Sequence, residues 1–151
     1  MTTELELITK LNEVFPDVCF TKIESLDQKF SDCGTENLFC QTTQAKPLCV
    51  VRPGENHNEQ LARLVELARD YKKKIVARGG GSGVCGAFKV RGGEIVVDMT
   101  SLDKIVLIKE PTADSEGLVM VEAGVFGDKL DEFLKQKGFT IIELIITIAI
   151  L

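Results

Sequence analysis

One strand–helix–strand pattern constrains the fold of this chain more than any other feature of its sequence. The apolar run Pro47–Val51 ends at the turn signal Pro53-Gly54, and a second β-branched run, Lys74–Ala77, follows later in the chain. The segment between them opens near Asn56 and has the apolar periodicity of a helix. Two strands joined by a helix within about thirty residues form a βαβ unit, whose strands are parallel and whose crossover is right-handed.

The helix of this unit has an apolar stripe at helical spacing. Asn56 and Glu59 have the spacing of an N-cap residue and its reciprocal partner. The charged residues of the segment fall on the other side, which is expected to face solvent: Arg63, Glu66, Arg69 and Asp70. We expect the buried stripe to consist of Leu61, Leu64, Val65 and Ala68.

Two further helices are expected. Thr3 and Glu6 have the spacing of a capping box, and apolar residues recur at helical intervals from Leu7 until Pro16 stops the pattern. The last helix is expected from about Phe126 to Lys137, with Gly138 at its C′ position and with Leu130, Phe133 and Leu134 inward.

Three strand patterns lie between the glycine-rich segment and the last helix. Glu94–Asp98, Lys104–Ile108 and Leu118–Glu122 follow one another at close intervals and are separated by turn-like segments. Close spacing of this kind is typical of a β-meander. The chain is therefore expected to be an α+β protein, in which the βαβ unit is followed by a β-meander and a helix.

Composition and charge argue against several classes of function. The 151 residues have a net charge of −5 and no basic stripe, so nucleic acid is not an expected partner. The five cysteines include no Cys-x-x-Cys pair, and the single histidine, His57, lies at a helix start. We therefore predict no metal site and no catalytic residue. The N-terminus lacks the pattern of a secretory signal, which indicates a cytoplasmic location.

Glycine is the commonest residue between Arg78 and Gly86. Backbone amides in such a run form an anion-binding concavity, so a phosphate or pyrophosphate ligand is the first hypothesis and a flexible linker is the alternative. A P-loop does not fit, because no lysine follows Gly86. The dinucleotide fingerprint Gly-x-Gly-x-x-Gly is matched from Gly81, but that fingerprint opens a helix, whereas here another strand soon follows.

Several motifs, taken in order, resemble the FAD-binding domain of the vanillyl-alcohol oxidase and p-cresol methylhydroxylase family. Within that family the chain is most similar to the flavoprotein subunit of glycolate oxidase and to D-lactate dehydrogenases, and the resemblance runs from about Leu7 to Phe139. It implies the first half of a PCMH-type FAD-binding fold. The motifs are Pro47–Pro53, Ile75–Gly83, Gly93–Asp103 and Val121–Val125.

This resemblance implies that FAD is the cofactor and that two stretches of the chain bind it. Amides of the glycine-rich loop would wrap the pyrophosphate, Arg78 would add charge or brace the loop, and Val121–Val125 would lie near the adenine and ribose. Because the loop contains Ser82 and no histidine, the FAD is expected to be non-covalent, with Cys85 a structural residue. The implied cofactor-binding residues are Arg78, Gly79, Gly80, Gly81, Ser82, Gly83, Gly86, Ala87, Glu122, Gly124 and Val125.

Residues 139–151 depart from the family pattern. Lys137–Ala149 resembles the processing motif and first helix of type IV prepilins, with Phe139 after the cleavage glycine and Glu143 at the fifth mature position. The apolar run is too short to cross a bilayer, which takes about twenty residues, so it allows only weak membrane association. We favour a gene-fusion or frame-shift scar, or an artefact that joins two coding sequences, over an ordinary buried strand. The expected domains are a lead-in (1–45), a partial FAD-binding domain (46–138) and this tail (139–151).

The predicted function is therefore the FAD-binding portion of a flavin-dependent oxidoreductase of the glycolate and D-lactate dehydrogenase type. The resemblance implies a 2-hydroxy acid as substrate, but the substrate domain of the family is not found in this chain. Weak or absent FAD binding and no turnover are expected of the chain alone. One alternative is a membrane-anchored or filament-related fusion through the prepilin-like segment. Another is a module that binds a different nucleotide, such as a nicotinamide dinucleotide.

Overall fold

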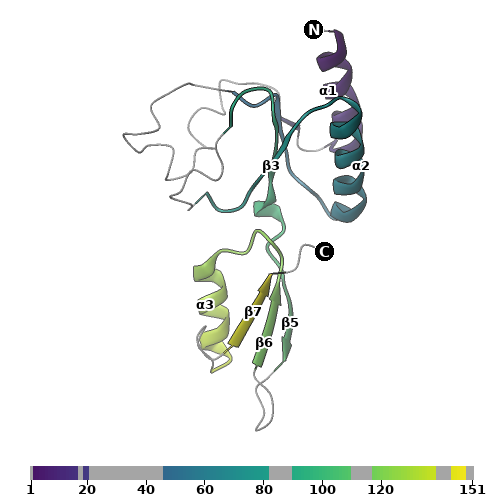
Figure 1. Cartoon of the computed structure of the whole chain (residues 1–151). Coiled ribbons are helices and arrows are strands. Elements are labelled where there is room, and N and C mark those ends of the chain that lie inside the picture. The colour runs from purple at the N-terminus through teal and green to yellow at the C-terminus, as the bar shows by residue number, and fades with distance from the viewer. Residues whose placement is uncertain are drawn as a thin grey trace, which may run out of the picture. The chain divides into compact units, whose positions relative to one another are not determined.

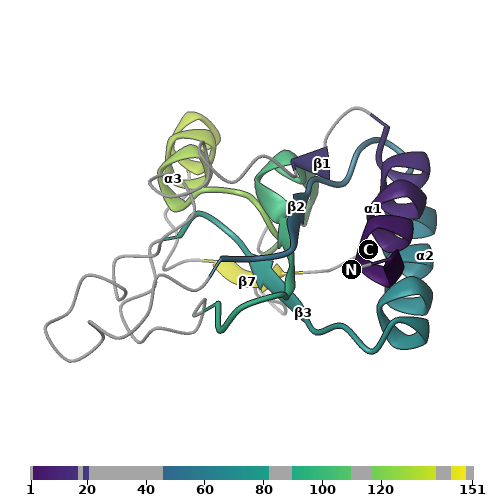
Figure 2. The same cartoon turned by 90° about the horizontal axis from the view of Figure 1, so that it is seen from above.

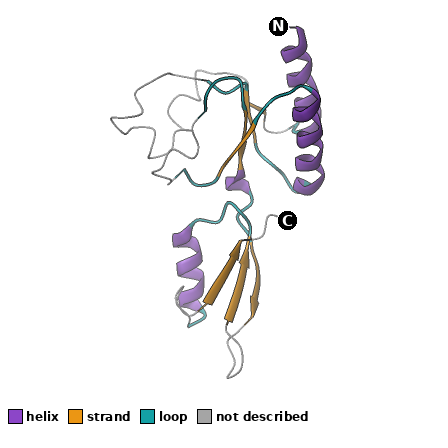
Figure 3. Ribbon diagram, in the orientation of Figure 1, coloured by secondary structure: helices purple, strands orange, loops and turns teal. Residues whose placement is uncertain are grey.

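The computed structural model describes residues 2–16, 19–20, 46–81, 90–109, 117–138 and 144–148. The chain divides into two compact units, Met1–Met99 and Thr100–Leu151, and each unit contains its own sheet (Figure 1). Helices and strands occur in both units, as Figure 3 shows by colour. The α+β class expected from the sequence is confirmed.

A four-stranded sheet with the order β1-β2-β4-β3 forms the centre of the first unit. The short β1 (Cys19–Phe20) is antiparallel to β2 (Cys49–Val51). Both β2 and β3 (Ile75–Arg78) pair in parallel with β4 (Ile95–Asp98). Since α2 (His57–Asp70) connects β2 to β3, the βαβ unit is confirmed, with β4 inserted between its two strands.

β4 is not part of the expected meander, because it pairs with β2 and β3. Every residue of β4 is buried, as is typical of a strand that has parallel neighbours on both sides. Val96 aligns with Val50 on one side and Val76 on the other, and these residues pack with Val90. Of the three strands predicted to form a meander, only the last two, Ile105–Lys109 and Gly117–Val121, pair in an antiparallel manner. An apolar run predicts a strand but does not specify the neighbours of that strand.

The first helix, α1 (Thr2–Val14), lies beside α2, as Figure 2 shows. Leu7, Leu11 and Phe15 are fully buried, as the periodicity predicted. The buried stripe of α2 is Leu64, Leu67 and Ala68. The prediction for Val65 is wrong, because 58% of this residue is exposed. Leu67 takes the inward position instead. Tyr71, four residues further on, contacts α1 through its hydroxyl.

Neither predicted side-chain cap is present. Asn56 is the N-cap of α2, but its side chain makes no capping hydrogen bond. The Gln60 side chain joins the elements instead: its Oε1 accepts from the Gly54 amide at 2.7 Å, and its Nε2 donates to the Val14 carbonyl at 3.0 Å. Thr3 lies inside α1 rather than before it.

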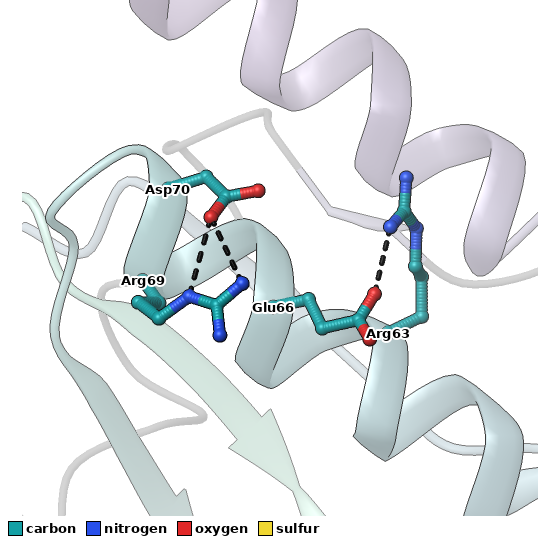
Figure 4. Close-up of polar contacts among 4 residues, drawn as sticks. All are labelled: Arg63, Glu66, Arg69 and Asp70. Carbon is teal, nitrogen blue, oxygen red and sulfur yellow. Dashed lines mark hydrogen bonds and ion pairs between the residues drawn. The ribbon is translucent and has the colours of Figure 1, made fainter.

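The charged side of α2 faces solvent, as expected. Figure 4 shows its two ion pairs: Arg63 Nη1 to Glu66 Oε2 at 2.7 Å, and Arg69 Nη2 to Asp70 Oδ1 at 3.2 Å. All four side chains are more than half exposed, so each pair contributes about 0–1 kcal/mol at most. The stability of α2 therefore depends on its apolar face.

A three-stranded sheet with the order β5-β6-β7 lies in the second unit. β5 (Ile105–Lys109) is antiparallel to β6 (Gly117–Val121), and β6 is parallel to β7 (Leu144–Ile148). Between β6 and β7 runs α3 (Gly127–Gln136). A short 3₁₀ helix, η2 (Met99–Ser101), follows β4.

The face of α3 packs as predicted. Leu130 and Leu134 are buried with Val119 and Val121 of β6, and Phe133 is partly buried against them. Gly138, with φ of +81°, follows the C-cap residue of the helix, as the sequence indicated.

The described part of residues 139–151 is a strand. Gly117 to Val121 of β6 align residue for residue with Leu144 to Ile148 of β7. This is the strand alternative rather than the prepilin-like helix. In the part of the chain that the structure describes, no helix is both long and apolar enough to cross a bilayer.

A buried carboxylate closes the turn before β4. Glu94 is only 5% exposed, and its Oε2 accepts from the amides of Arg91 at 3.1 Å and Gly92 at 2.6 Å. Gly92 and Gly93 have φ of +115° and +79°, which only glycine adopts readily. The turn therefore depends on two glycines and one anion.

We predict that Glu94→Ala lowers the free energy of unfolding by about 1–3 kcal/mol, because two part-buried amide hydrogen bonds lose their charged acceptor. Glu94→Gln keeps an acceptor oxygen and is expected to cost less. Urea unfolding monitored by circular dichroism measures both changes. Glu132→Ala, at an exposed position on α3, is the matched control. A Glu94→Ala variant as stable as this control would contradict the assignment.

Two glutamates attach α1 to the end of α2. Lys73 Nζ lies 2.5 Å from Glu4 Oε1, and its hydrogen bond and charge lower the pKa of Glu4 below the ordinary value of 4.5. The Tyr71 hydroxyl donates to Glu6 Oε1 at 2.7 Å, and this bond, together with Lys10, lowers the pKa of Glu6. The ionised carboxylates of Glu4 and Glu6 therefore stabilise the folded state.

The contribution of these glutamates to stability should be fully present above pH 4.5 and lost as the pH falls through their lowered folded-state pKa values. A Glu4→Gln/Glu6→Gln variant should therefore be less stable than the wild-type chain at pH 7. The two should converge as the pH falls below 4.5 and through the lowered pKa values, and urea unfolding at a series of pH values tests this. A stability difference that stays constant with pH would rule out the linkage.

Candidate functional site

The predicted phosphate-binding residues begin at the carboxyl end of β3. Arg78 is the last residue of this strand, and Gly79, Gly80 and Gly81 follow in a bend. Gly81 has φ of +73°, a conformation that favours glycine. Ser82, Gly83, Gly86 and Ala87, with Cys85, lie outside the described residues.

The Arg78 side chain folds back over this bend. Its Nη1 donates to the Gly79 carbonyl at 3.3 Å. A Cβ atom placed on Gly81 would lie 2.5 Å from Arg78 Nη2 and 3.1 Å from Arg78 Cζ. The guanidinium thus occupies the space that any side chain at position 81 would need. Of the two roles expected for Arg78, these contacts are those of a brace.

Arg52, Asp98 and Arg78 lie in one row across the carboxyl ends of three parallel strands. Arg78 aligns with Asp98 in the register of β3 and β4. Arg52 directly follows Val51, which aligns with Val97, the residue before Asp98. In parallel sheets of this kind, ligands bind beyond the carboxyl ends of the strands.

Arg52 and Asp98 form an ion pair that the sequence did not reveal. Asp98 Oδ2 accepts from Arg52 Nη2 at 2.6 Å and from Nε at 3.2 Å. The Asp98 side chain is 2% exposed, and that of Arg52 is 37% exposed. The carboxylate is therefore inside the fold, and the guanidinium is at its surface. The available signal was a charged residue at the end of each of two strands whose other residues are apolar.

The second group of predicted residues lies in the turn after β6. The Glu122 amide donates to the Lys104 carbonyl at 2.9 Å, and Glu122 Oε2 accepts from the Lys104 amide at 2.8 Å. The Gly124 amide donates to the Leu102 carbonyl at 2.7 Å, and the Val125 amide donates to Glu122 at 3.2 Å. These three amides are used inside the unit. A ligand at this turn would meet other groups.

The predicted residues are divided between the two units. Arg78 to Gly81 belong to the first unit, and Glu122, Gly124 and Val125 belong to the second. The Val125 side chain packs against the core of its own unit. His57 is the first residue of α2 and is partly buried. Among the described residues, no three metal-ligating side chains gather in one place.

Comparison with known families gives a match over most of the regular part of the chain. A family model described as an FAD binding domain matches residues 47–145, more than half of the 151 residues. The match includes β2, α2, β3 and the glycine-rich loop, and it continues into β7.

A curated relative and two solved structures are similar to this chain. The alkyldihydroxyacetonephosphate synthase of Caenorhabditis elegans is 34% identical over 99 residues, which are 62% of this chain and 15% of that protein. A structure of p-cresol methylhydroxylase with substrate bound has a TM-score of 0.70 at 17% identity, over 92% of this chain and 26% of that one. A structure of alkyldihydroxyacetonephosphate synthase has a TM-score of 0.67 at 23% identity, over 89% of this chain and 25% of that one. The two structures show a shared fold.

We predict that Gly81→Ala destabilises the protein by about 1–2 kcal/mol from its positive φ alone, with a further cost from the collision with Arg78. Arg78→Ala/Gly81→Ala should remove the collision and keep the backbone cost. A double-mutant cycle in urea measures the two parts.

Gly127→Ala is the matched control for this cycle, because no atom lies within 4 Å of its added Cβ. It should be neutral or slightly stabilising at the start of α3. Purely additive effects at positions 78 and 81 would contradict the contact between the Arg78 guanidinium and Gly81.

Proposed function

The chain belongs to the FAD-binding domain family, and from this membership we propose that it is the cofactor-binding domain of an FAD-dependent oxidoreductase. The observation that carries the proposal is the bend at Gly79–Gly81, at the carboxyl end of a parallel strand. Backbone amides in a bend of this kind form a site for phosphate oxygens.

The residues at the bend suit a pyrophosphate. Gly81 leaves no side chain between its backbone and a ligand, and the space beside it is closed by the Arg78 guanidinium. The Arg78 guanidinium braces the bend through the Gly79 carbonyl, and the proposed phosphate contacts are the backbone amides of the bend. Gly79, Gly80 and Gly81 are the described residues that would hold the pyrophosphate.

FAD supplies hydride-transfer chemistry through its isoalloxazine ring when it is bound. The chain's own part is to bind and orient the cofactor. Non-covalent attachment is proposed, because the loop contains Ser82 and no histidine. Glu122, Gly124 and Val125 are proposed as contacts for adenine and ribose, through groups other than the three amides that their turn already uses.

The substrate class has two candidates. The motifs of the chain favour a 2-hydroxy acid, as in glycolate oxidase and D-lactate dehydrogenases. The identity to alkyldihydroxyacetonephosphate synthases over about 100 residues favours an enzyme of that type. This chain spans 15% of the length of those relatives, so either activity is a proposal for the protein to which this domain contributes. Reduction of bound flavin by glycolate or D-lactate would favour the first candidate.

A second proposal is a membrane-anchored or filament-related protein, and it is based on the prepilin-like segment. Processing after Gly138, detected by mass spectrometry of the expressed chain, would favour a membrane or filament component. An intact C-terminus together with FAD binding would favour the flavoprotein domain. The cytoplasmic location and the weak membrane association predicted from the sequence remain predictions.

Binding of FAD should stabilise the folded chain more than binding of NAD or ATP. The affinity is expected to be weak, so each ligand is used at rising concentration in thermal unfolding. At ten times its Kd, FAD should add about 1.4 kcal/mol of stability. Gly127→Ala should respond to FAD as the wild-type chain does, and Gly81→Ala should respond less. A larger shift with NAD than with FAD would favour the alternative nucleotide-binding module.

A further inference from the structure

The ion pair between Arg52 and Asp98 is asymmetric in its surroundings. Asp98 is 2% exposed, and a carboxylate buried to this degree requires a cation or several donors. Arg52 supplies that cation, although more than a third of its own side chain remains exposed. The pair therefore fixes a guanidinium at the surface of the sheet edge by means of an anion below it.

Only part of the guanidinium is used by this pair. Nε and Nη2 both donate to the same oxygen of Asp98, Oδ2. Nη1 makes no hydrogen bond within the described part of the chain. Because a guanidinium donates from all three of its nitrogens, the Nη1 side of Arg52 can still bind an anion.

Arg52 lies at the same sheet edge as the glycine bend. β4 is the one strand between β2 and β3, and neighbouring strands are about 4.8 Å apart, so the Arg52 and Arg78 backbones are roughly 10 Å apart. Arg52 therefore presents a partly exposed guanidinium at this end of the sheet, in a chain whose net charge is −5. A cation in this position can contact an anionic ligand that binds at the glycine bend.

We infer that Arg52 is a second cationic contact for the pyrophosphate of FAD, and that Asp98 is the positioning residue that holds it. The inference rests on the proposed function. Arg78 then braces the glycine bend from one side of β4, and Arg52 contacts the phosphate oxygens from the other side. The competing explanation is that the Arg52–Asp98 ion pair has a structural role alone and stabilises the pairing of β2 with β4.

Arg52→Gln tests the inference in the full chain, with FAD as the probe. The Kd for FAD should rise on the order of tenfold, as expected for one lost hydrogen bond to a charged group. Arg63→Gln removes the same charge from an exposed pair on α2, and its Kd should equal that of the wild-type chain. Flavin fluorescence titration measures each Kd.

The salt dependence of FAD binding distinguishes a contact between Arg52 and the ligand from a purely structural ion pair. Added salt should weaken FAD binding by the wild-type chain and by Arg63→Gln, and less so by Arg52→Gln, because one screened attraction is gone. Arg52→Gln should lower the unfolding temperature under either explanation, because it leaves the buried Asp98 carboxylate without its cation. If the pair only links β2 to β4, the salt dependence of FAD binding should stay that of the wild-type chain. That result would overturn the inference.

Arg52→Lys serves if the Gln variant does not fold. Lysine keeps the charge beside Asp98 but lacks the planar fork that can contact two anions at once, so FAD binding should weaken severalfold. Unchanged binding in this variant would also overturn the inference. A wild-type chain that binds no FAD would instead refute the proposed function, so the two failures are distinguishable.

Discussion

The parallel pairing of β4 with both β2 and β3 is the constraint on which the first unit depends. It buries the whole of β4 and places three strand ends at one edge of the sheet. The glycine bend, the Arg78 brace and the Arg52–Asp98 pair all lie at that edge. A change in this pairing by one residue would exchange the faces of the strand and take Asp98 away from Arg52. The strand register therefore determines the geometry of the site.

The helices and most strand positions were predictable from the sequence because they depend on local periodicity. Strand partners depend on contacts between distant residues, so the place of β4 between β2 and β3 was not predictable. The rotation of α2 was ambiguous for a related reason. Val65 and Leu67 lie close together in the sequence, and the packing of α2 in the folded chain, which no local pattern specifies, buries Leu67 and leaves Val65 exposed.

The glycine-rich part of the site was predictable from the sequence, because its proposed chemistry depends on residue type. Glycines in a loop indicate close approach of a ligand, and the described ones lie in a bend at a strand end. Arg52 and Asp98 were missed as a pair because they are 46 residues apart in the chain and lie in two different motifs. Burial makes such pairs important, since removing either partner leaves an uncompensated charge. Charged residues at the ends of apolar strands therefore merit attention as pairs.

The strand β7 gives a structural reason for the isoleucine-rich sequence near the C-terminus. β6, α3 and β7 form a second βαβ arrangement, since β6 and β7 are parallel and α3 lies between them in the chain. A strand in such an arrangement favours β-branched residues, which also occur in the first helix of a prepilin. The family match ends at residue 145, inside β7, and the pairing with β6 continues in the same register to Ile148. The structure thus gives Leu144–Ile148 the place of a strand paired with β6.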